Sequence, residues 1–413
     1  MVKKLIGALD IGTNKIFGLC GICQGESIEV LGAEAYPTPE EGVKQGRIVD
    51  IEAVSDTIYN TISEINKQSG ERLEWVTTGI GGGHLKGLLH SKSISIDPEG
   101  REISDADIRS LRKELNASIS GGNVLSRKVL DSLPQEYVID SQTVTRKDPV
   151  GMHGNSLEMK VHAVTVEVNP LKDLLHVIKE ANLHAEFVYP HSWAAAEAVL
   201  SEEEKKLGCT LIDMGGGTTD TVFFRDAATH MTDSFKIGGG NIDKDLSILL
   251  HTPLSYAEEL KIKYARCDIA ALVKEKNPIL SESVDVSSAS GRNRRKSNVE
   301  EVSRIVHARV REILEDFVRQ RGARSAFFHN AGAGVVLTGG CARLKGMAEL
   351  CEQVFELPAR VALPKRLTNL DKNFYSPEYA AGVGLLILAS KRERKEKKEN
   401  LLARLKRQAR KWF

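Results

Sequence analysis

The sequence has no run of apolar residues long enough to cross a membrane. A spanning helix needs about 20 consecutive, mostly apolar residues, and no segment of the 413-residue chain approaches that composition. The first ten residues, MVKKLIGALD, lead directly into a strand-like segment, which is not the pattern of a cleavable signal peptide. We therefore expect a chain without a spanning segment that stays in the cytoplasm.

Cysteine is also scarce, with six residues in the whole chain. Cys20 and Cys23 form a Cys-x-x-Cys pair inside KIFGLCGICQG, a segment typical of a β-strand. Side chains three positions apart on a strand point to opposite faces of the sheet, which excludes a shared metal ion. The other four cysteines stand beside apolar runs, where a free cysteine acts as a small hydrophobic residue. This usage agrees with a reducing compartment.

The length and composition are those of a soluble protein with more than one domain. Hydrophobic residues make up 41% of the chain and charged residues 27%. The formal net charge of +1 conceals an asymmetry between body and tail. Residues 391–413 carry eleven Lys and Arg against three Glu, while the rest carries 46 basic and 53 acidic residues. The chain is therefore an acidic body with a basic C-terminal tail.

Two distant segments share one pattern, in which a short apolar run is followed by an aspartate and then by glycine and threonine. They are IGALDIGTNK at 6–15 and LIDMGGGTTD at 211–220. Glycine lets the backbone approach a ligand closely, a turn of exposed amides attracts anions, and a carboxylate can hold hydrated Mg²⁺. One copy alone would suit an ordinary glycine-rich hairpin. Two copies, each with the aspartate in the same place, favour two phosphate-binding turns between strands.

Two further segments also recur, which predicts two similar α/β lobes facing each other across a cleft. TTGIGGGHLKG at 77–87 resembles LTGGCARLKG at 337–346, and HSWAAAEAVL at 191–200 resembles SPEYAAGVGLLIL at 376–388. The last two segments are rich in small residues, which suits helices that cross closely at a hinge. Segments after Gly87 and after Gly240 break the repeat and indicate insertions. In the second insertion, we expect residues 281–298 to form an exposed loop.

These motifs resemble those of the actin-like ATPase fold shared by actin, the seventy-kilodalton chaperones and sugar kinases. EGVKQGRIVDIEAVSDTI and DPVGMHGNSLEMKVHAVT are, more narrowly, similar to segments of the FtsA family of bacterial cell-division proteins. The resemblance implies an α/β, two-lobed fold of duplicated RNase H-like domains. It also implies subdomain 1A at 1–86 and 166–195, 1C at 87–165, 2A at 196–240 and 305–388, 2B at 241–304, a charged linker at 389–400 and an amphipathic membrane-targeting helix at 401–413.

The same resemblance implies that ATP and Mg²⁺ bind in the cleft between the lobes. Asp10 and Asp213 would hold the metal through water. Glu258 and Lys261 share one helix face through their i, i+3 spacing, although a plain surface ion pair has the same spacing. The nucleotide-binding positions that match the family are Asp10, Gly12, Thr13, Asn14, Lys15, Asp213, Gly215, Gly216, Gly217, Thr218, Gly238, Gly239, Gly240, Glu258, Lys261, Gly339 and Gly340.

Hydrolysis of the nucleotide has weaker support, because it needs a group that orients the attacking water. Active relatives supply a Gln or Glu near the first connecting helix, where this chain reads FVYPHSWAAAEAVL. His191 is a candidate, although a histidine at a helix start is more often a cap or a packing residue. We expect at most weak ATPase activity and assign no catalytic residue.

The C-terminal segment LLARLKRQARKWF predicts an amphipathic helix on a membrane surface. At 100° per residue its apolar side chains share an arc of about 120°. A helix packed on its own domain would show the same stripe, but a purely basic polar face and two terminal aromatics favour a membrane. The residues expected at the membrane are Leu401, Leu402, Leu405, Trp412 and Phe413, with Arg404, Arg407 and Lys411.

The leading functional interpretation is an ATP-binding cell-division protein that self-assembles into filaments. It would anchor the FtsZ ring at the cytoplasmic face of the membrane and recruit later division proteins, with no nucleic acid as partner. We expect the helical segment 302–318, with Arg304, Arg309 and Arg311 beside an apolar stripe, to receive the C-terminal peptide of FtsZ. The alternatives are a PilM-like protein of pilus assembly and a small-molecule kinase of the same superfamily.

Overall fold

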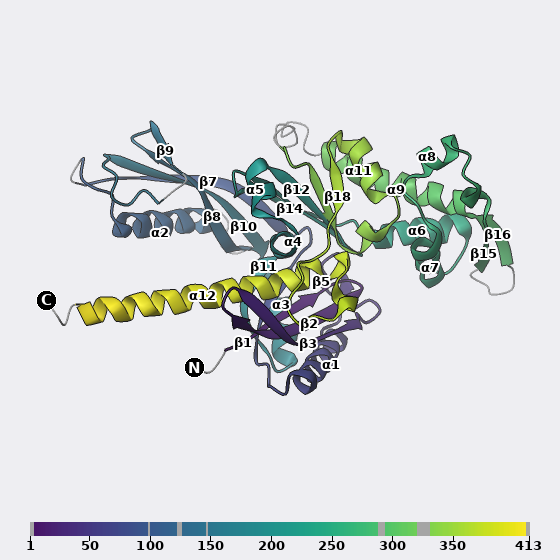
Figure 1. The fold of residues 1–413 in the computed structure, drawn as a ribbon, viewed down its shortest axis with the longest axis horizontal. Helices are drawn as coiled ribbons and strands as arrows, with labels where there is room; N and C mark the ends of the chain where they lie inside the picture. The colour runs from purple at the N-terminus through teal and green to yellow at the C-terminus, as the bar shows by residue number, and fades with distance from the viewer. Residues whose placement is uncertain are drawn as a thin grey trace.

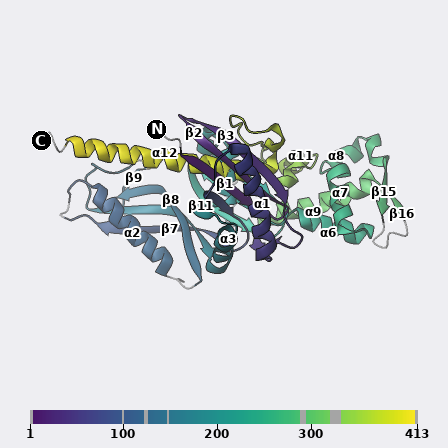
Figure 2. The same ribbon diagram turned by 90° about the horizontal axis from the view of Figure 1, so that it is seen from below.

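The chain folds into two α/β lobes, each carrying one further subdomain (Figure 1). The computed structural model describes residues 4–97, 100–121, 126–145, 148–287, 294–319 and 331–409. The molecule is elongated. The insertion from β7 (Leu85–Ser95) to β10 (Ser156–Glu167) and the end of helix α12 (Ala380–Ala409) lie at one end (Figures 1 and 2). Helices α7 (Leu254–Tyr264) and α8 (Ile269–Lys274) lie at the other.

The first lobe is a five-stranded sheet in the order β11-β6-β1-β2-β3. Helix α1 (Ile51–Ser69) begins where the Asp50 carboxylate accepts a hydrogen bond from the Ala53 amide, and it ends at Gly70 in the left-handed conformation. Its buried face packs on β2 and β3. The strands and remaining elements of this lobe are β1 (Leu5–Ile11), β2 (Lys15–Gln24), β3 (Ser27–Pro37), β4 (Val43–Lys44), β5 (Arg47–Ile48), β6 (Trp75–Ile80), α3 (Val168–Glu180) and β11 (His184–Pro190).

The second lobe repeats this architecture with the sheet order β14-β13-β12-β17-β18. In both lobes two antiparallel hairpins lead from the central strand, and two parallel strands complete the other side. The repeat confirms the two similar lobes expected from the sequence. The elements are α5 (Glu202–Leu207), β12 (Cys209–Met214), β13 (Thr219–Arg225), β14 (Ala228–Phe235), β17 (Val335–Thr338), η3 (Gly340–Arg343), α11 (Met347–Phe355), β18 (Ala359–Val361), η4 (Lys372–Phe374) and η5 (Pro377–Tyr379).

The first insertion forms a separate sheet with its own core, in the order β7-β10-β8-β9. Helix α2 (Asp105–Gly121) covers one face, where its Leu111 and Leu115 are fully buried. A bidentate ion pair between Arg101 and Asp107, at 2.8 Å for each bond, fixes the start of this helix. The strands are β7 (Leu85–Ser95), β8 (Arg127–Ile139), β9 (Thr143–Thr145) and β10 (Ser156–Glu167).

The second insertion is mainly helical and shares a core with the outer face of the second sheet. Residues 281–298 were expected to form a loop, but Ser283–Ser287 pairs with Arg294–Asn298 as an antiparallel hairpin. Val284 and Val286 point into the core, and their burial favours the strand. The elements are α6 (Gly239–Leu250), α7 (Leu254–Tyr264), α8 (Ile269–Lys274), η1 (Pro278–Ser281), β15 (Ser283–Ser287), β16 (Arg294–Asn298) and α9 (Val299–Arg319).

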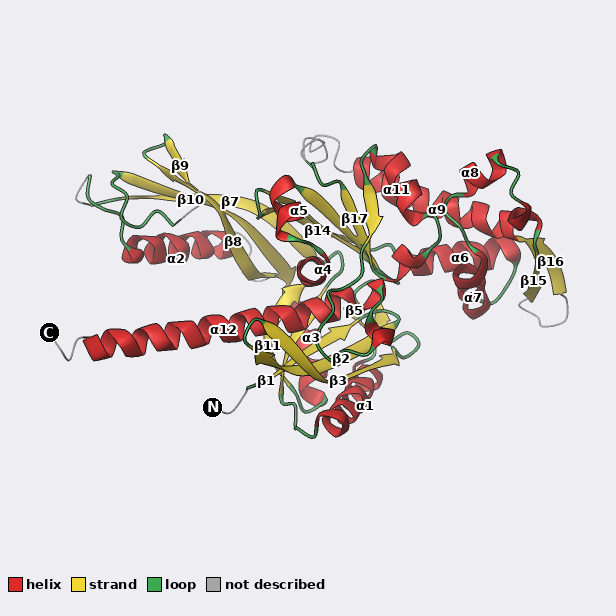
Figure 3. Ribbon diagram, in the orientation of Figure 1, coloured by secondary structure: helices red, strands yellow, loops and turns green. Residues whose placement is uncertain are grey.

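Two helices cross between the two sheets, α4 (His191–Val199) and α12 (Ala380–Ala409) (Figure 3). Their backbones approach so closely that a Cβ on Gly384 would lie well under 3.0 Å from the carbonyl oxygen of Ala194. Ala194, Ala195 and Ala196 are fully buried in the core that joins the facing sheets. The small residues therefore serve the close helix crossing expected at the hinge between the lobes.

Helix α12 corrects the expectation of a separate charged linker at 389–400. These residues continue the same helix, and their first turns pack on the body, with Ser390 and Glu393 buried. The charged residues favour a packed helix because they find partners there, as Arg392 does at the Tyr189 hydroxyl, 2.7 Å away. Among the described residues, no helix is both long and apolar enough for a membrane span. The side chains of the predicted membrane helix, 401–413, lie outside the described part.

Candidate functional site

A cavity of about 430 Å³ lies between the two lobes and is lined by residues from both. It gathers most of the positions proposed from the sequence, although these are spread over more than 300 residues of chain. Gly238 and Gly240 are the two proposed positions that do not line it. Those that do are Asp10, Gly12, Thr13, Asn14, Lys15, Asp213, Gly215, Gly216, Gly217, Thr218, Gly239, Glu258, Lys261, Gly339 and Gly340.

The two glycine turns have the same internal geometry and face each other. The Gly12 amide donates to the Lys15 carbonyl at 2.9 Å, and the Gly215 amide donates to the Thr218 carbonyl at 2.9 Å. A Cβ on Gly216 would lie well under 3.0 Å from Oδ1 of Asn14. The turns therefore come together only because position 216 has no side chain.

A third turn supports the second from behind. The Gly239 amide donates to the Gly215 carbonyl at 2.9 Å, and the Gly240 amide donates to the Gly216 carbonyl at 2.8 Å. Of the three successive glycines expected to bind the nucleotide, Gly238, Gly239 and Gly240, only Gly239 reaches the cavity. The amides of Gly239 and Gly240 hold the phosphate-type turn in place, while Gly238 packs against it, since a Cβ there would lie under 3.0 Å from the Gly215 carbonyl oxygen. Sequence alone does not separate these roles, because the three glycines are identical residues and differ only in the direction that the folded backbone gives to each of them.

Helix α7 closes the cavity from the second insertion. Lys261 forms a buried ion pair with Asp243 at 2.7 Å. The Asn14 amide group donates to the Glu258 carboxylate at 3.0 Å, and this hydrogen bond spans the cleft between the two lobes. The two α7 residues therefore share one helix face, as their spacing predicts, but each contacts a different lobe or helix rather than the other.

The carboxylates at the centre of the cavity surround one histidine. Nε2 of His191 lies 3.1 Å from Oδ1 of Asp10. Burial by itself lowers the pKa of His191, but Asp10 and the nearby Asp220 outweigh it and raise the pKa to about 9. Burial, with the charge of Asp220, raises the pKa of Asp213 to about 7. The Asp10 carboxylate thus favours the protonated form of His191, while burial favours the neutral forms of Asp213 and Asp220.

Comparison with known proteins agrees with this geometry. A family model described as cell division protein FtsA matches residues 210–384, and one described as the SHS2 domain inserted in FtsA matches residues 82–165. The cell division protein FtsA of Pseudomonas aeruginosa is 34% identical over 385 residues, which cover 93% of this chain and 89% of that protein. The chain belongs to the FtsA family. FtsA of Neisseria meningitidis is 32% identical over 422 residues, 98% of each chain.

Solved structures confirm the actin-like fold of this FtsA-family chain. The PilM–PilN type IV pilus biogenesis complex has a TM-score of 0.63 at 14% identity, covering 93% of this chain and 98% of that one. The MreB5 protein of Spiroplasma citri bound to ADP has a TM-score of 0.53 at 15% identity, covering 96% and 98%. At such identities the likeness concerns the fold alone. The pilus-assembly alternative therefore shares only the architecture, while sequence similarity assigns the chain to FtsA.

The FtsA-type cavity contains functional candidates that the sequence analysis did not assign. Asp220, at the end of the second glycine motif, is buried, and its carboxylate accepts a hydrogen bond from the Thr218 hydroxyl at 3.0 Å. Arg343 and Glu378 line the cavity and form an ion pair at 2.7 Å. Its position directly after the threonines of the second glycine motif was a usable signal for Asp220. No local signal marks Arg343 and Glu378, because they stand 35 residues apart.

The carboxylate cluster suits a hydrated divalent cation better than a directly ligated one. Among the described residues, no three His, Cys, Asp or Glu side chains form a set that could hold a metal ion. Asp10 and Asp213 both face the cavity, however, and a cation there would oppose the effects of burial and of the Asp220 charge, which raise the pKa of Asp213. Carboxylates that bind Mg²⁺ through its water shell fit this arrangement.

The helix expected to receive the FtsZ peptide, α9, buries the apolar stripe that was predicted beside its arginines. The apolar stripe of α9, including Val306 and Val310, is buried in the core of the second insertion. Its three arginines are held by acidic neighbours: Arg304 by Glu300, Arg309 by Asp245 and Glu312, and Arg311 by Glu315. The apolar stripe therefore belongs to the core, so the expectation that it lies open beside the arginines was wrong, whereas Arg304 and Arg311 remain 58% and 52% exposed.

Proposed function

We propose that the protein is an ATP-binding member of the FtsA family that assembles at the membrane and holds the FtsZ ring there. The observation that carries the nucleotide part is the meeting of two glycine turns from opposite lobes in one cavity. Within the described part of the chain, the Gly216 and Gly217 amides donate to no backbone acceptor, and with Lys15 beside them they would form an anion site that fits a polyphosphate. The structural neighbour MreB5 was solved with ADP bound.

Each part of the cavity has a place in this proposal. The turns at Gly12–Lys15 and Gly215–Thr218 would grip the phosphates, and Glu258 and Lys261 with the Gly339–Gly340 turn would border the nucleoside. Asp10 and Asp213 would hold Mg²⁺ through its water shell. The bound cation would shield the charge of the phosphates. Lys15 lies 4.9 Å from the ring centre of Tyr379, which positions its amine at the cavity wall.

Turnover of ATP is proposed to be weak at most. Glu197, the acid closest in sequence on the first connecting helix, is engaged by Lys205 and Lys391 at the end of α4 away from His191. His191 is protonated at neutral pH, so it donates a hydrogen bond rather than accepting one from water. The chain's own residues therefore bind and screen phosphate charge more readily than they orient a nucleophile.

Membrane attachment is proposed to come from residues 401–413. Helix α12 leaves the body at the end of the molecule where the first insertion also lies (Figures 1 and 2). The segment 401–413 is basic and ends in two aromatic residues, a composition that suits an anionic membrane at the cytoplasmic face. Filament formation has the support of an actin-like neighbour, a MamK double helical filament, with a TM-score of 0.51. FtsZ and later division proteins are proposed as partners on family membership.

The test is co-sedimentation with anionic lipid vesicles, with and without ATP, Mg²⁺ and FtsZ. The proposal predicts lipid-bound polymers that retain FtsZ and turn over ATP slowly. A small-molecule kinase would instead turn over ATP only with a hydroxyl-bearing acceptor and would ignore the vesicles. ATP binding measured by calorimetry, without any lipid or FtsZ binding, would reject the adaptor function and leave only a nucleotide-binding protein.

A further inference from the structure

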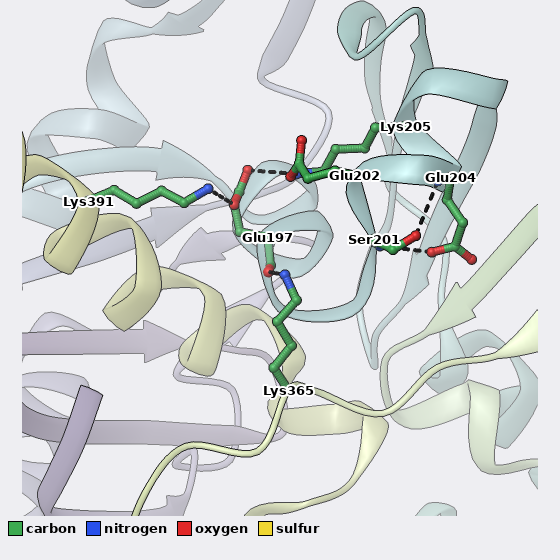
Figure 4. A network of polar contacts seen from close by, with 7 residues as sticks. All are labelled: Glu197, Ser201, Glu202, Glu204, Lys205, Lys365 and Lys391. Carbon is green, nitrogen blue, oxygen red and sulfur yellow. Dashed lines mark hydrogen bonds and ion pairs between the residues drawn. The ribbon is translucent and has the colours of Figure 1, made fainter. Parts of the chain in front are cut away.

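Glu197 lies at the centre of a charged network that joins three parts of the molecule (Figure 4). It stands at the end of α4, with its side chain 18% exposed. One carboxylate oxygen is 3.0 Å from Nζ of Lys205 on α5, and the other pairs with Lys391 on α12. Its carbonyl accepts from Nζ of Lys365 at 2.8 Å. Burial raises the pKa of Glu197, but Lys205 and Lys391 outweigh it and lower the pKa, which keeps the carboxylate charged.

Lys205 and Lys365 both belong to the second lobe. Lys205 precedes β12, and Lys365 follows β18, where its amide also donates to the Ala198 carbonyl at 2.8 Å. Lys205 is almost fully buried, so this attachment is rigid. Through Glu197, the Lys391 side chain of α12 is therefore fixed to a point that moves with the second lobe.

The neighbouring residues of α12 are fixed to the first lobe and its insertion. Arg392 bonds the Tyr189 hydroxyl of β11, stacks 5.1 Å from the ring centre of Phe187, and lies 3.5 Å from Asp131 of β8. The Cys23 thiol of β2 donates to the Ser390 hydroxyl at 3.2 Å. Three consecutive residues of α12, within one helical turn, thus hold contacts to two different lobes.

The start of α12 reaches the nucleotide cavity. Ala381 lines the cavity, and a Cβ on Gly382 would lie 3.5 Å from Cβ of Asp10. At the other end of α4, His191 contacts Asp10. From that wall α12 runs without a break for 30 residues, a length of about 45 Å. Beyond Lys391 about 27 Å of this helix projects toward the C-terminal tail.

We propose that Glu197 is a positioning residue that makes the direction of the tail helix depend on the nucleotide. This inference rests on the proposed nucleotide and membrane functions. When the lobes move around a bound nucleotide, Lys205 and Lys365 carry Glu197 with the second lobe, and Glu197 pulls α12 through Lys391. A rotation of about 10° at this point displaces the last helical turn by about 5 Å. The nucleotide bound in the cleft thereby sets the direction in which the membrane tail points.

The test measures lobe closure and tail movement separately, by electron–electron spin distances in the full-length protein. Labels are attached through a non-natural amino acid, so that all native cysteines stay. Tyr59 on α1 and Leu207 on α5 are 53% and 66% exposed, and the distance between them reports lobe closure. The distance from Tyr59 to position 400 reports the tail helix relative to the first lobe.

With a non-hydrolysable ATP analogue and Mg²⁺, the wild type should shift both distances, the tail distance by about 3 Å or more. Glu197→Gln should keep the lobe shift and analogue affinity but lose the tail shift. Lys391→Gln, on a half-exposed side chain, tests the same link if the first variant fails to fold. Glu202→Gln is the matched control, since Glu202 pairs with Lys205 at 3.1 Å, and in the described residues no hydrogen bond or ion pair joins Glu202 to α12. It should keep both shifts.

The inference is overturned if the lobes close in the wild type and the tail distance does not change. It is equally overturned if Glu197→Gln and Lys391→Gln retain the full tail shift. Absence of analogue binding in calorimetry is a different result, because it removes the proposed nucleotide site and the coupling with it. Loss of both distance shifts in Glu197→Gln, with binding intact, would mean that Glu197 serves the hinge itself rather than the tail.

Discussion

The contact between the two glycine turns makes a sharp prediction for Gly216→Ala. A methyl group at this position would meet Oδ1 of Asn14 well under 3.0 Å away, a separation that real Cβ contacts do not show. Either the Asn14 side chain or the turn itself must move. We expect the protein to fold, because the substitution lies at the cavity wall rather than in either core, and to lose affinity for ATP.

The size of the loss follows from the backbone donors of the turn. The Gly215 amide is already bonded to the Thr218 carbonyl, and among the described residues the amides of Gly216 and Gly217 donate to no backbone acceptor. Two hydrogen bonds to charged phosphate oxygens contribute about 1.5–3 kcal/mol each. Losing both weakens binding about 10²- to 10⁴-fold. Gly216→Val, with a larger and branched side chain, should abolish measurable binding.

A double-mutant cycle with Asn14→Ala identifies the cause. Without the Asn14 amide the methyl group has room, so Gly216→Ala should weaken ATP binding much less in that background. Calorimetry at fixed Mg²⁺ measures the four affinities, and circular dichroism checks folding. Gly25→Asn is a suitable control, since Gly25 faces open space in a left-handed conformation that Asn tolerates. Equal losses in both backgrounds would refute the steric explanation, and unchanged affinity of a folded Gly216→Val protein would refute the phosphate turn.

Three further predictions concern the tail and the stability of the body. Trp412→Glu should release the protein from anionic vesicles in a flotation assay, while ATP binding persists. High salt should weaken the lipid binding of the wild type without removing its apolar part. Unchanged lipid binding after truncation before residue 401 would contradict this prediction. Lys261→Met should lower the free energy of unfolding, measured by chemical denaturation, by about 3–5 kcal/mol, because Asp243 is left buried and unpaired. The double variant Lys261→Met with Asp243→Asn should recover part of this lost stability. Arg101 lowers the pKa of Asp107, so this pair stabilises the fold above the unfolded-state pKa of about 4 and the contribution disappears as pH falls further. Asp107→Asn should therefore flatten the acid limb of stability against pH, and a parallel shift at all pH values would argue against the ion pair.

The fold could be predicted in large part because its signals are local. Each glycine turn needs the same residues at the same spacing, and the duplication is therefore visible in the sequence at 6–15 and 211–220. The runs of small residues in the two crossing helices likewise predict a close helix crossing. By contrast, the burial of the α9 stripe depends on what packs against it. An amphipathic helix has the same periodicity whether its apolar face meets a partner or its own core.

The sequence by itself determined the two lobes, the paired turns and the charged tail, since these follow from glycine stereochemistry, periodicity and composition. Tertiary structure alone decided the electrostatics of the cavity and the course of the tail helix. The pKa of His191 is raised because folding places the ring beside the Asp10 carboxylate, against the opposite effect of burial. Residues 389–400 continue helix α12 along the body, where Lys391 and Arg392 meet Tyr189, Asp131 and Glu197. Those partners lie some 200 residues or more away along the chain, and only the fold brings them within hydrogen-bond distance.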